Sequence, residues 1–276
     1  MVKSIERESK GPGILFVIVV LLIVGVVAAR FIWYRPATED TAQNLPRVDV
    51  GLPGTPSGTP EARTPNEAGR PAVIIYHAHA SENYSPNESH STQGRAGDVV
   101  EVGAELARQL EAKGIKAIHL RNVNDWPRYN EAYQVAASVV QPVIQSTPNL
   151  AAVIDIHRDG LAGKPDGYTT ALINGEPAAK ILLVVGDLEN PELDSNLAFA
   201  EQIRTGLNRL YPDLSRGLKI LHTEYNGHLH PNHLTVFMGD YTDNTLEEAK
   251  RGAAALAAVL AEALKGQGTT GAGVEG

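Results

Sequence analysis

Short apolar runs alternate with longer segments of helical spacing from residue 71 to residue 265, and this alternation limits the fold more than any other feature of the sequence. Residues 72–76, 115–120 and 151–157 have the length and apolar content of buried strands. Between the first two runs, apolar residues recur at helical spacing until Lys113-Gly114. Strands that alternate with helices usually form one sheet covered by helices. The sequence therefore predicts an α/β fold with a single mixed, mostly parallel sheet.

Two local motifs predict the second half of this domain in more detail. Residues 169–174 and 180–185 are expected to be strands that pair around Asn174-Gly175, because this dipeptide favours tight hairpin turns. Thr245 and Glu248 form a capping box, which predicts a helix that begins there. The remaining pattern predicts helices at 128–146 and 197–210 and strands at 218–221 and 234–238.

The segments outside the domain have a different character. After a stub of residues 1–12, residues 13–34 are apolar enough to cross a membrane and end in an aromatic edge. A cleaved signal peptide is the alternative, because Val27-Ala28-Ala29 resembles a cleavage site. Residues 35–70 are rich in Pro and Gly and predict a disordered tether, and residues 266–276 predict a flexible tail. We expect a single-pass protein of the cell membrane, with a cytoplasmic stub and an extracytoplasmic domain over 71–265.

Charge and cysteine content exclude several classes of function. The net charge is −8, without a basic cluster, which argues against a nucleic-acid partner. Cysteine is absent, so disulfides, cysteine-bound zinc and thiol catalysis are excluded.

Two predicted strands end in histidine, at the edge of the sheet where α/β proteins bind ligands. The first is followed by His77, His79 and Glu82, and the second ends in His157. In an extended segment His77 and His79 would share a face, and a turn would bring Glu82 back toward them. Two imidazoles and one carboxylate leave a fourth position of zinc open, as a catalytic site requires. Zinc in such a site makes water acidic enough to act near neutral pH and polarises a carbonyl oxygen. A solvated or hydrogen-bonded histidine is the simpler interpretation of each residue taken alone.

Other motifs point less clearly to chemistry. His228 and His230 form a rival histidine pair, which we interpret as a polar rim or plain surface. The sequence contains no G-x-S-x-G elbow, no phosphate-binding P-loop and no H-E-x-x-H motif.

Several segments, in order, resemble the stage II sporulation protein P family. The resemblance covers about residues 73–264 and is carried by YHAHASENY (76–84), DVVEVGAELARQL (98–110), VIDIHRDG (153–160), AAKILLVVG (178–186), NLAFA (196–200), YNGHL (225–229) and DNTLEEA (243–249). The family acts as N-acetylmuramoyl-L-alanine amidases, resembles zinc amidases in fold and is usually anchored by one N-terminal span facing the cell wall. The resemblance therefore implies a zinc amidase-like domain preceded by one transmembrane helix.

Site residues follow from the matched motifs. The resemblance implies a zinc site of His77, Glu82 and His157, with the choice between His77 and His79 open. Asp98 competes with Glu82 as the third ligand. The resemblance also implies that Arg158, Asn226 and His228 contact substrate and that Arg158 orients the ligands as well.

One departure from the family concerns proton transfer. Relatives carry a catalytic glutamate in the segment before the NTLEEA helix, and Phe237 stands at that position here. A phenyl ring transfers no proton. Asp240 and Glu224 are the candidates to replace the glutamate as catalytic residues.

The resemblance implies a peptidoglycan hydrolase that acts in sporulation, during wall remodelling at engulfment. Its substrate bond would join the muramyl lactyl group to L-alanine, and endopeptidase activity at cross-links is a further expectation. Partners by resemblance are the membrane and the stage II sporulation proteins D and M. Two alternatives stay open: a weak or inactive peptidoglycan-binding scaffold, because of Phe237, and a metallocarboxypeptidase-like enzyme with another amide substrate.

Overall fold

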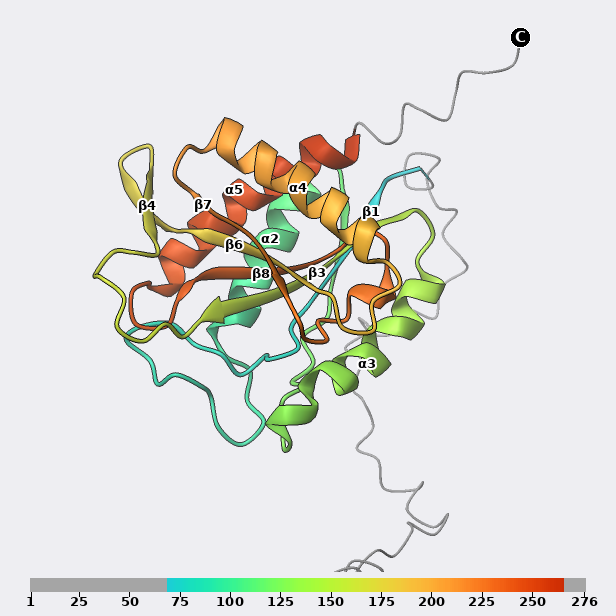
Figure 1. Cartoon of the computed structure of the whole chain (residues 1–276), viewed down its shortest axis with the longest axis horizontal. Helices are drawn as coiled ribbons and strands as arrows, with labels where there is room; N and C mark the ends of the chain where they lie inside the picture. Colours follow the sequence, from blue (N-terminus) through green and yellow to red (C-terminus); the bar gives the residue numbers. More distant parts are fainter. Residues whose placement is uncertain (1–68, 266–276) are drawn as a thin grey trace, which may run out of the picture. The chain divides into compact units, whose positions relative to one another are not determined.

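The computed structural model describes residues 69–265, which form a six-stranded sheet with helices on both faces (Figure 1). The order of strands across the sheet is β2-β1-β3-β8-β6-β7. The strands are β1 (Ala72–Tyr76), β2 (Lys116–His119), β3 (Leu150–Asp159), β6 (Ile181–Gly186), β7 (Ser215–Leu221) and β8 (His233–Asp240). All neighbouring pairs are parallel except β6 and β8. The prediction of a single mixed, mostly parallel main sheet is confirmed, and a separate two-stranded hairpin accompanies it.

The next two strands after β1 are added on opposite sides of it, first β2 and then β3. From β1 it passes through helix α2 (Asp98–Ala112) to β2, and then through α3 (Ala132–Ser146), which the short turn η2 (Tyr129–Glu131) precedes, to β3 on the other side of β1. Parallel crossovers are right-handed, so α2 and α3 must cover opposite faces of the sheet. The carboxyl ends of β1 and β3 therefore flank a crevice of the kind in which open α/β sheets bind ligands.

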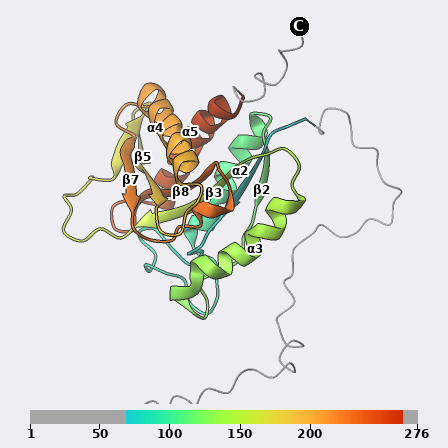
Figure 2. The ribbon, with the colours of Figure 1, turned by 45° about the vertical axis from the view of Figure 1, so that its right-hand side comes forward.

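Alternation along the strands divides the core between these two faces. Val73 and Ile75 of β1 pack with α2, α4 (Leu193–Leu210) and α5 (Leu246–Lys265) in the larger cluster of buried residues. Ile74 and Tyr76 pack with α3 in the smaller one. Figure 2 shows α3 on the side of the sheet opposite to the other three helices. Side chains of β3 and β8 that point toward α3, near the carboxyl ends, are the ones that can build a site beneath this single helix.

The two local motifs have different outcomes. The turn is correct, because Asn174 and Gly175 both adopt positive φ, 53° and 85°, and join the hairpin of β4 (Thr170–Ile173) and β5 (Glu176–Ala179). The predicted partner strand is wrong: residues 181–186 are β6 of the main sheet instead. Its buried, branched apolar side chains suit a strand covered on both faces. The capping box is confirmed, since the Thr245 N–H donates to Glu248 Oε2 over 2.9 Å at the start of α5.

The predicted membrane anchor of residues 13–34 lies outside the described residues, as do most of the tether and the tail. Within residues 69–265, none of the helices combines the length and the apolar character that crossing a membrane requires.

Gly97 allows the loop after β1 to pack on the first turn of α2. A Cβ atom at this position would lie 2.3 Å from the Glu82 carbonyl oxygen and 2.4 Å from that of Ser81. We expect Gly97→Ala to lower the free energy of unfolding by about 1–3 kcal/mol, the usual cost of overpacking. Gly160→Ala is the matched control, because its Cβ would meet only Arg158 Nη1, at 3.6 Å. Urea unfolding of both variants checks this, and equal losses would contradict it.

Candidate metal centre

His79, Glu82 and His157 meet at the carboxyl ends of β1 and β3. One donor atom from each of the three lies within 4.8 Å of the others. Glu82 and His157 are buried, whereas His79 is partly exposed, so the cluster can be reached from solvent on that side. The sequence motif behind it is H-x-x-E, with the turn of residues 78–81 folding Glu82 back toward His79.

The donor set fits zinc. Zinc in catalytic sites is held by histidine nitrogens and carboxylate oxygens at about 2.0–2.2 Å, with three protein ligands and one open position. Donor atoms that share one tetrahedral ion at such distances are roughly 3.4 Å apart, so donors as far as 4.8 Å from one another need to approach by up to about 1.4 Å. His79, Glu82 and His157 would hold the ion.

His157 lies between two carboxylates. Its Nδ1 is 3.3 Å from Glu82 Oε2, and its Nε2 is 3.0 Å from Asp155 Oδ2. Burial alone would lower the pKa of His157, but the charges of Asp155 and Glu82 outweigh this and raise it to about 10. The pKa of Glu82 is lowered, because the proximity of His157 and Arg158 outweighs its burial. Two carboxylates close to one imidazole ring provide negative charge that suits a divalent cation.

His77, the first choice for a ligand, lies outside the cluster. Its Nδ1 donates to the Ile156 carbonyl oxygen over 3.1 Å, and its Nε2 contacts His119 Nε2 at 2.9 Å. Burial lowers its pKa to about 4. A neutral ring that donates through Nδ1 must accept through Nε2, so both nitrogens of His77 are engaged. We therefore revise the proposed metal set from His77 to His79.

Asp98, the competitor of Glu82, also lies outside the cluster. Its Oδ2 accepts hydrogen bonds from the Tyr84 N–H, over 3.0 Å, and from Asn87 Nδ2, over 2.8 Å. These contacts fasten the loop of residues 84–87 to the first turn of α2. The geometry favours Glu82 as the third ligand.

Arg158 and Asn226 hold parts of the site in place. The Arg158 guanidinium donates to the carbonyl oxygens of Asn83 and Ser89, and its backbone N–H donates to Glu82 Oε2. Asn226, buried and at a positive φ of 57°, donates to the Tyr133 carbonyl oxygen over 2.9 Å. These contacts support the expected orienting role of Arg158. Contact of either residue with substrate stays a prediction, as does that of the exposed His228.

Aromatic rings flank the cluster beneath α3. The Tyr133 ring stacks on His157 with centroids 5.9 Å apart, and Tyr129 lies 4.3 Å from His79 by the same measure. Phe237 also stacks on His157, with ring centroids 5.3 Å apart. Phe237 is the register partner of His157 across β3 and β8. The position at which the family resemblance implies a glutamate is therefore adjacent to the proposed metal ligand.

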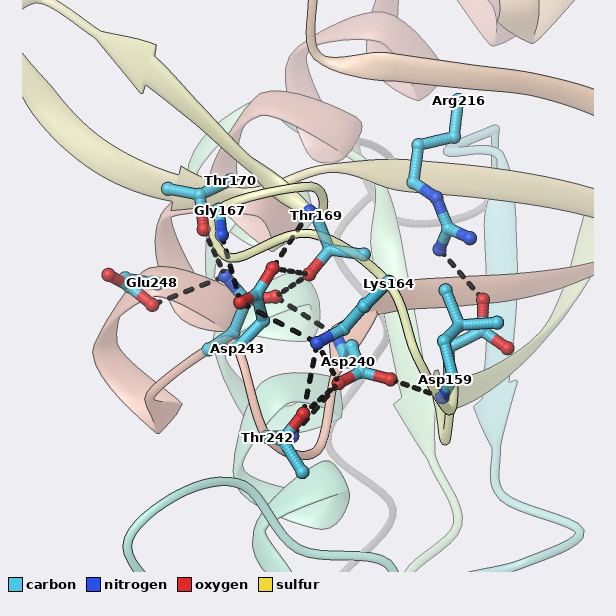
Figure 3. Close-up of polar contacts among 12 residues, drawn as sticks. Asp159, Lys164, Gly167, Thr169, Thr170, Arg216, Asp240, Thr242, Asp243 and Glu248 are labelled. Atoms are coloured by element: carbon cyan, nitrogen blue, oxygen red, sulfur yellow. Dashed lines mark hydrogen bonds and ion pairs between the residues drawn. The ribbon is translucent and has the colours of Figure 1, made fainter.

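Asp240, one proton-transfer candidate, belongs to a different polar network (Figure 3). Its carboxylate accepts hydrogen bonds from the backbone N–H groups of Leu161 and Thr242, and it pairs with Lys164 at 3.1 Å. Burial would raise the pKa of Asp240, but these donors outweigh it and lower it. The network ties the loop after β3 to the turn before α5. Asp240 has a structural role here, and the proposed catalytic role stays a prediction that these contacts do not favour.

Glu224, the other candidate, lies in a surface pocket next to the cluster. Tyr133, whose ring stacks on His157, lines the same pocket, with Asn130, Gln134, Leu188, His222 and Thr223. Glu224 is thus linked to the proposed metal site through Tyr133, in a pocket that none of the three ligands lines.

Buried neutral histidines outside the cluster predict an acid-sensitive fold. Burial lowers the pKa of His77 and of His233 to about 4, and that of His119 to about 3. Unfolded histidines titrate near pH 6.5, so the unfolded chain binds these protons at higher pH, and stability falls as the pH drops from about 6.5 to about 4. We expect His233→Gln to reduce this slope by up to about 1.4 kcal/mol per pH unit.

Urea unfolding between pH 6.5 and 4.5 measures that slope. Tyr76→Phe is the matched control, because it removes the 2.9 Å hydrogen bond to His233 and keeps the imidazole. An unchanged slope in His233→Gln would contradict the expectation.

The fold and the cluster together define an α/β protein with a zinc-type His–Glu–His arrangement at the edge of its sheet. The family model "Stage II sporulation protein P" matches residues 36–261, and the chain belongs to this family. It is 28% identical over 240 residues to stage II sporulation protein P of Bacillus subtilis (strain 168). That match covers 81% of this chain and 59% of the relative, so the chain spans well under two thirds of the relative's length.

Solved structures with some similarity include two amidases. The N-acetylmuramoyl-L-alanine amidase AmiC2 of Nostoc punctiforme is 17% identical, with a TM-score of 0.45 over 72% of this chain and 99% of that one. The CwlD amidase from Clostridioides difficile, in complex with the GerS lipoprotein, is 13% identical, with a TM-score of 0.47 over 71% and 99%.

Proposed function

We propose that this protein is a zinc-dependent peptidoglycan hydrolase of the N-acetylmuramoyl-L-alanine amidase type, which acts in wall remodelling during sporulation. The convergence of His79, Glu82 and His157 within 4.8 Å carries the proposal. Membership of the stage II sporulation protein P family supports the cell-wall setting. Cleavage of peptide cross-links is a second activity of the same proposal.

The chemistry assigned to the site is hydrolysis of an amide. Zinc held there would supply a nucleophilic water near neutral pH and polarise the carbonyl oxygen. Among the protein groups, His79, Glu82 and His157 would hold the ion, and the Tyr133 and Phe237 rings each stack on His157. Glu224 is the carboxylate we assign to proton transfer, because it lines a pocket with Tyr133, whose ring stacks on His157.

A second candidate function is a peptidoglycan-binding scaffold with little or no hydrolysis. Phe237 is the observation that favours it, because the ring adjacent to His157 occupies the position of a proton-transferring residue. In both cases we propose a single-pass protein of the cell membrane with its domain facing the wall. The stage II sporulation proteins D and M are its proposed partners.

Digestion of purified sacculi by the zinc-loaded protein separates these functions. The amidase predicts new lactyl ends on muramic acid together with free L-alanine amino groups. Free amines without lactyl ends would indicate a peptidase. Binding that sediments with the sacculi, without any released product, would contradict the hydrolase and favour the scaffold.

Variants of the two carboxylates test the proton-transfer assignment in the same assay. We expect Glu224→Gln to lower kcat by about 10²–10⁴-fold, the usual contribution of a general acid or base. Asp240→Asn is expected to lower the stability of the fold, because Asp240 accepts hydrogen bonds from the backbone N–H groups of Leu161 and Thr242. Full turnover in Glu224→Gln would remove it as the proton carrier.

A further inference from the structure

We propose that Asp155 is a positioning residue for the metal centre, one that fixes His157 so that its Nδ1 faces the ion. The inference deepens the proposed function and rests on the metal site of His79, Glu82 and His157. Asp155 was not among the site residues expected from the sequence.

The Asp155 carboxylate connects the two segments that carry the ligands. It lies in β3, two residues before His157, and is completely buried. Its Oδ1 accepts the backbone N–H of Ala78 over 2.9 Å, directly before His79. Its Oδ2 lies 3.0 Å from His157 Nε2, in an ion pair. One side chain therefore links the segment that carries His79 to the His157 ring.

The same contacts decide which nitrogen of His157 can bind the metal. An ionised carboxylate only accepts, so the Nε2 that faces Asp155 carries hydrogen. Nδ1 faces the other way, 3.3 Å from Glu82 Oε2, into the cluster. Histidines that bind metal usually donate their second N–H to a carboxylate or carbonyl, which fixes the ring and raises its basicity. Asp155 Oδ2, at 3.0 Å from Nε2, is close enough to accept this N–H from His157.

An amide could not replace this carboxylate without loss. The Ala78 N–H donates to Oδ1, and His157 Nε2 lies 3.0 Å from Oδ2 in an ion pair, so both oxygens face a nitrogen. Asparagine has a single acceptor oxygen, so its NH₂ group would face one of these two donors. The Tyr76 hydroxyl and His233 also lie near Asp155, and they contact each other at 2.9 Å.

Asp125 provides the matched control. It is also buried, and its Oδ2 accepts the backbone N–H of Ser81 over 3.2 Å and the Ser81 hydroxyl. It thus holds the same loop between His79 and Glu82 without an ion pair to either histidine. Asp125→Asn removes a buried carboxylate from the same loop, keeps an acceptor oxygen for Ser81 and should leave the His157 ring in place.

Zinc affinity of the full chain, measured by competition with a chelator, tests the proposal. We expect Asp155→Asn to bind zinc about 10–100-fold more weakly than the wild type, the usual effect of removing a carboxylate behind a metal-bound histidine. Asp125→Asn should stay within about threefold of the wild type on that scale. Equal affinity of the wild type and Asp155→Asn, or equal losses in both variants, would overturn the proposal.

The binding nitrogen gives a readout that a merely structural role would not move. In cadmium-113-loaded protein with ¹⁵N-labelled histidine, we expect coupling of the metal to Nδ1 of His157 in the wild type, weakened or lost in Asp155→Asn. Coupling to Nε2 in the wild type would overturn the proposal. A wild type that binds no zinc would overturn the metal site and this proposal with it, whereas zinc binding without sacculus hydrolysis would overturn the proposed activity alone.

Discussion

Replacing His79 with alanine is expected to lower zinc affinity by more than about 100-fold, because loss of a direct ligand should exceed the 10–100-fold effect of a residue behind one. His77→Asn is expected to change zinc affinity by less than about tenfold on the same scale. The reason is that His77 uses both ring nitrogens on Ile156 and His119, whereas His79 joins Glu82 and His157. Equilibrium competition with a chelator measures both affinities.

His77 is fully buried, so its variant also needs a check of folding. We expect His77→Asn to unfold at lower urea concentration than the wild type and still to bind zinc once folded. Tight zinc binding by His79→Ala, combined with loss of binding in a folded His77→Asn, would reverse the assignment.

In the Glu224→Gln background, Phe237→Glu is expected to raise sacculus hydrolysis by roughly 10²-fold, the lower end of what a general acid or base contributes. The Phe237 ring lies beside His157, with centroids 5.3 Å apart, and is partly exposed. A carboxylate at this position would therefore reach the reacting groups next to the proposed metal. The family resemblance implies a glutamate at the same place.

Phe237→Gln is the matched control, because it has the length of glutamate and transfers no proton. Muropeptide release should rise in Phe237→Glu but not in Phe237→Gln. Zinc affinity should stay within about tenfold of the wild type in both variants. Equal turnover of Phe237→Glu and Phe237→Gln would contradict a role of this position in proton transfer, and would leave Glu224 as the assigned carboxylate.

The order of strands and helices could be predicted because each buried element has a clear period. The strands at 72–76 and 234–238 and the helix after the capping box appear close to their expected bounds. Pairing was harder to predict, since a turn motif such as Asn174-Gly175 defines where a hairpin turns and not how far its second strand extends. The backbone groups of β5 pair with β4, and β6 leaves for the main sheet.

The site could be predicted as a region but not residue by residue. His77 was favoured over His79 by the family resemblance, and the sequence expectation that the two share a face rested on an extended segment. β1 ends at Tyr76, and the turn of residues 78–81 separates the two rings. The H-x-x-E spacing of His79 and Glu82 was the signal for the pair that the structure brings together with His157.

Asp155 and Asp240 differ in how far the sequence could place them. Asp155 stands two residues before His157 in a strand, and period-two alternation alone would have placed both on one face. Asp240 is the last residue of β8. A register shift between β3 and β8 near Asp159 and the positive φ of Gly239 accompany its place in the Lys164 network. Such shifts have no clear signature in one sequence.

X-ray absorption spectroscopy at the zinc edge of the metal-loaded protein tests the central claim most directly. We expect a four-coordinate ion with two imidazole nitrogens and carboxylate or water oxygens at about 2.0–2.2 Å, and loss of one imidazole shell in His79→Ala. A zinc environment without imidazole, or one that is unchanged in His79→Ala and altered in His77→Asn, would contradict the metal centre formed by His79, Glu82 and His157.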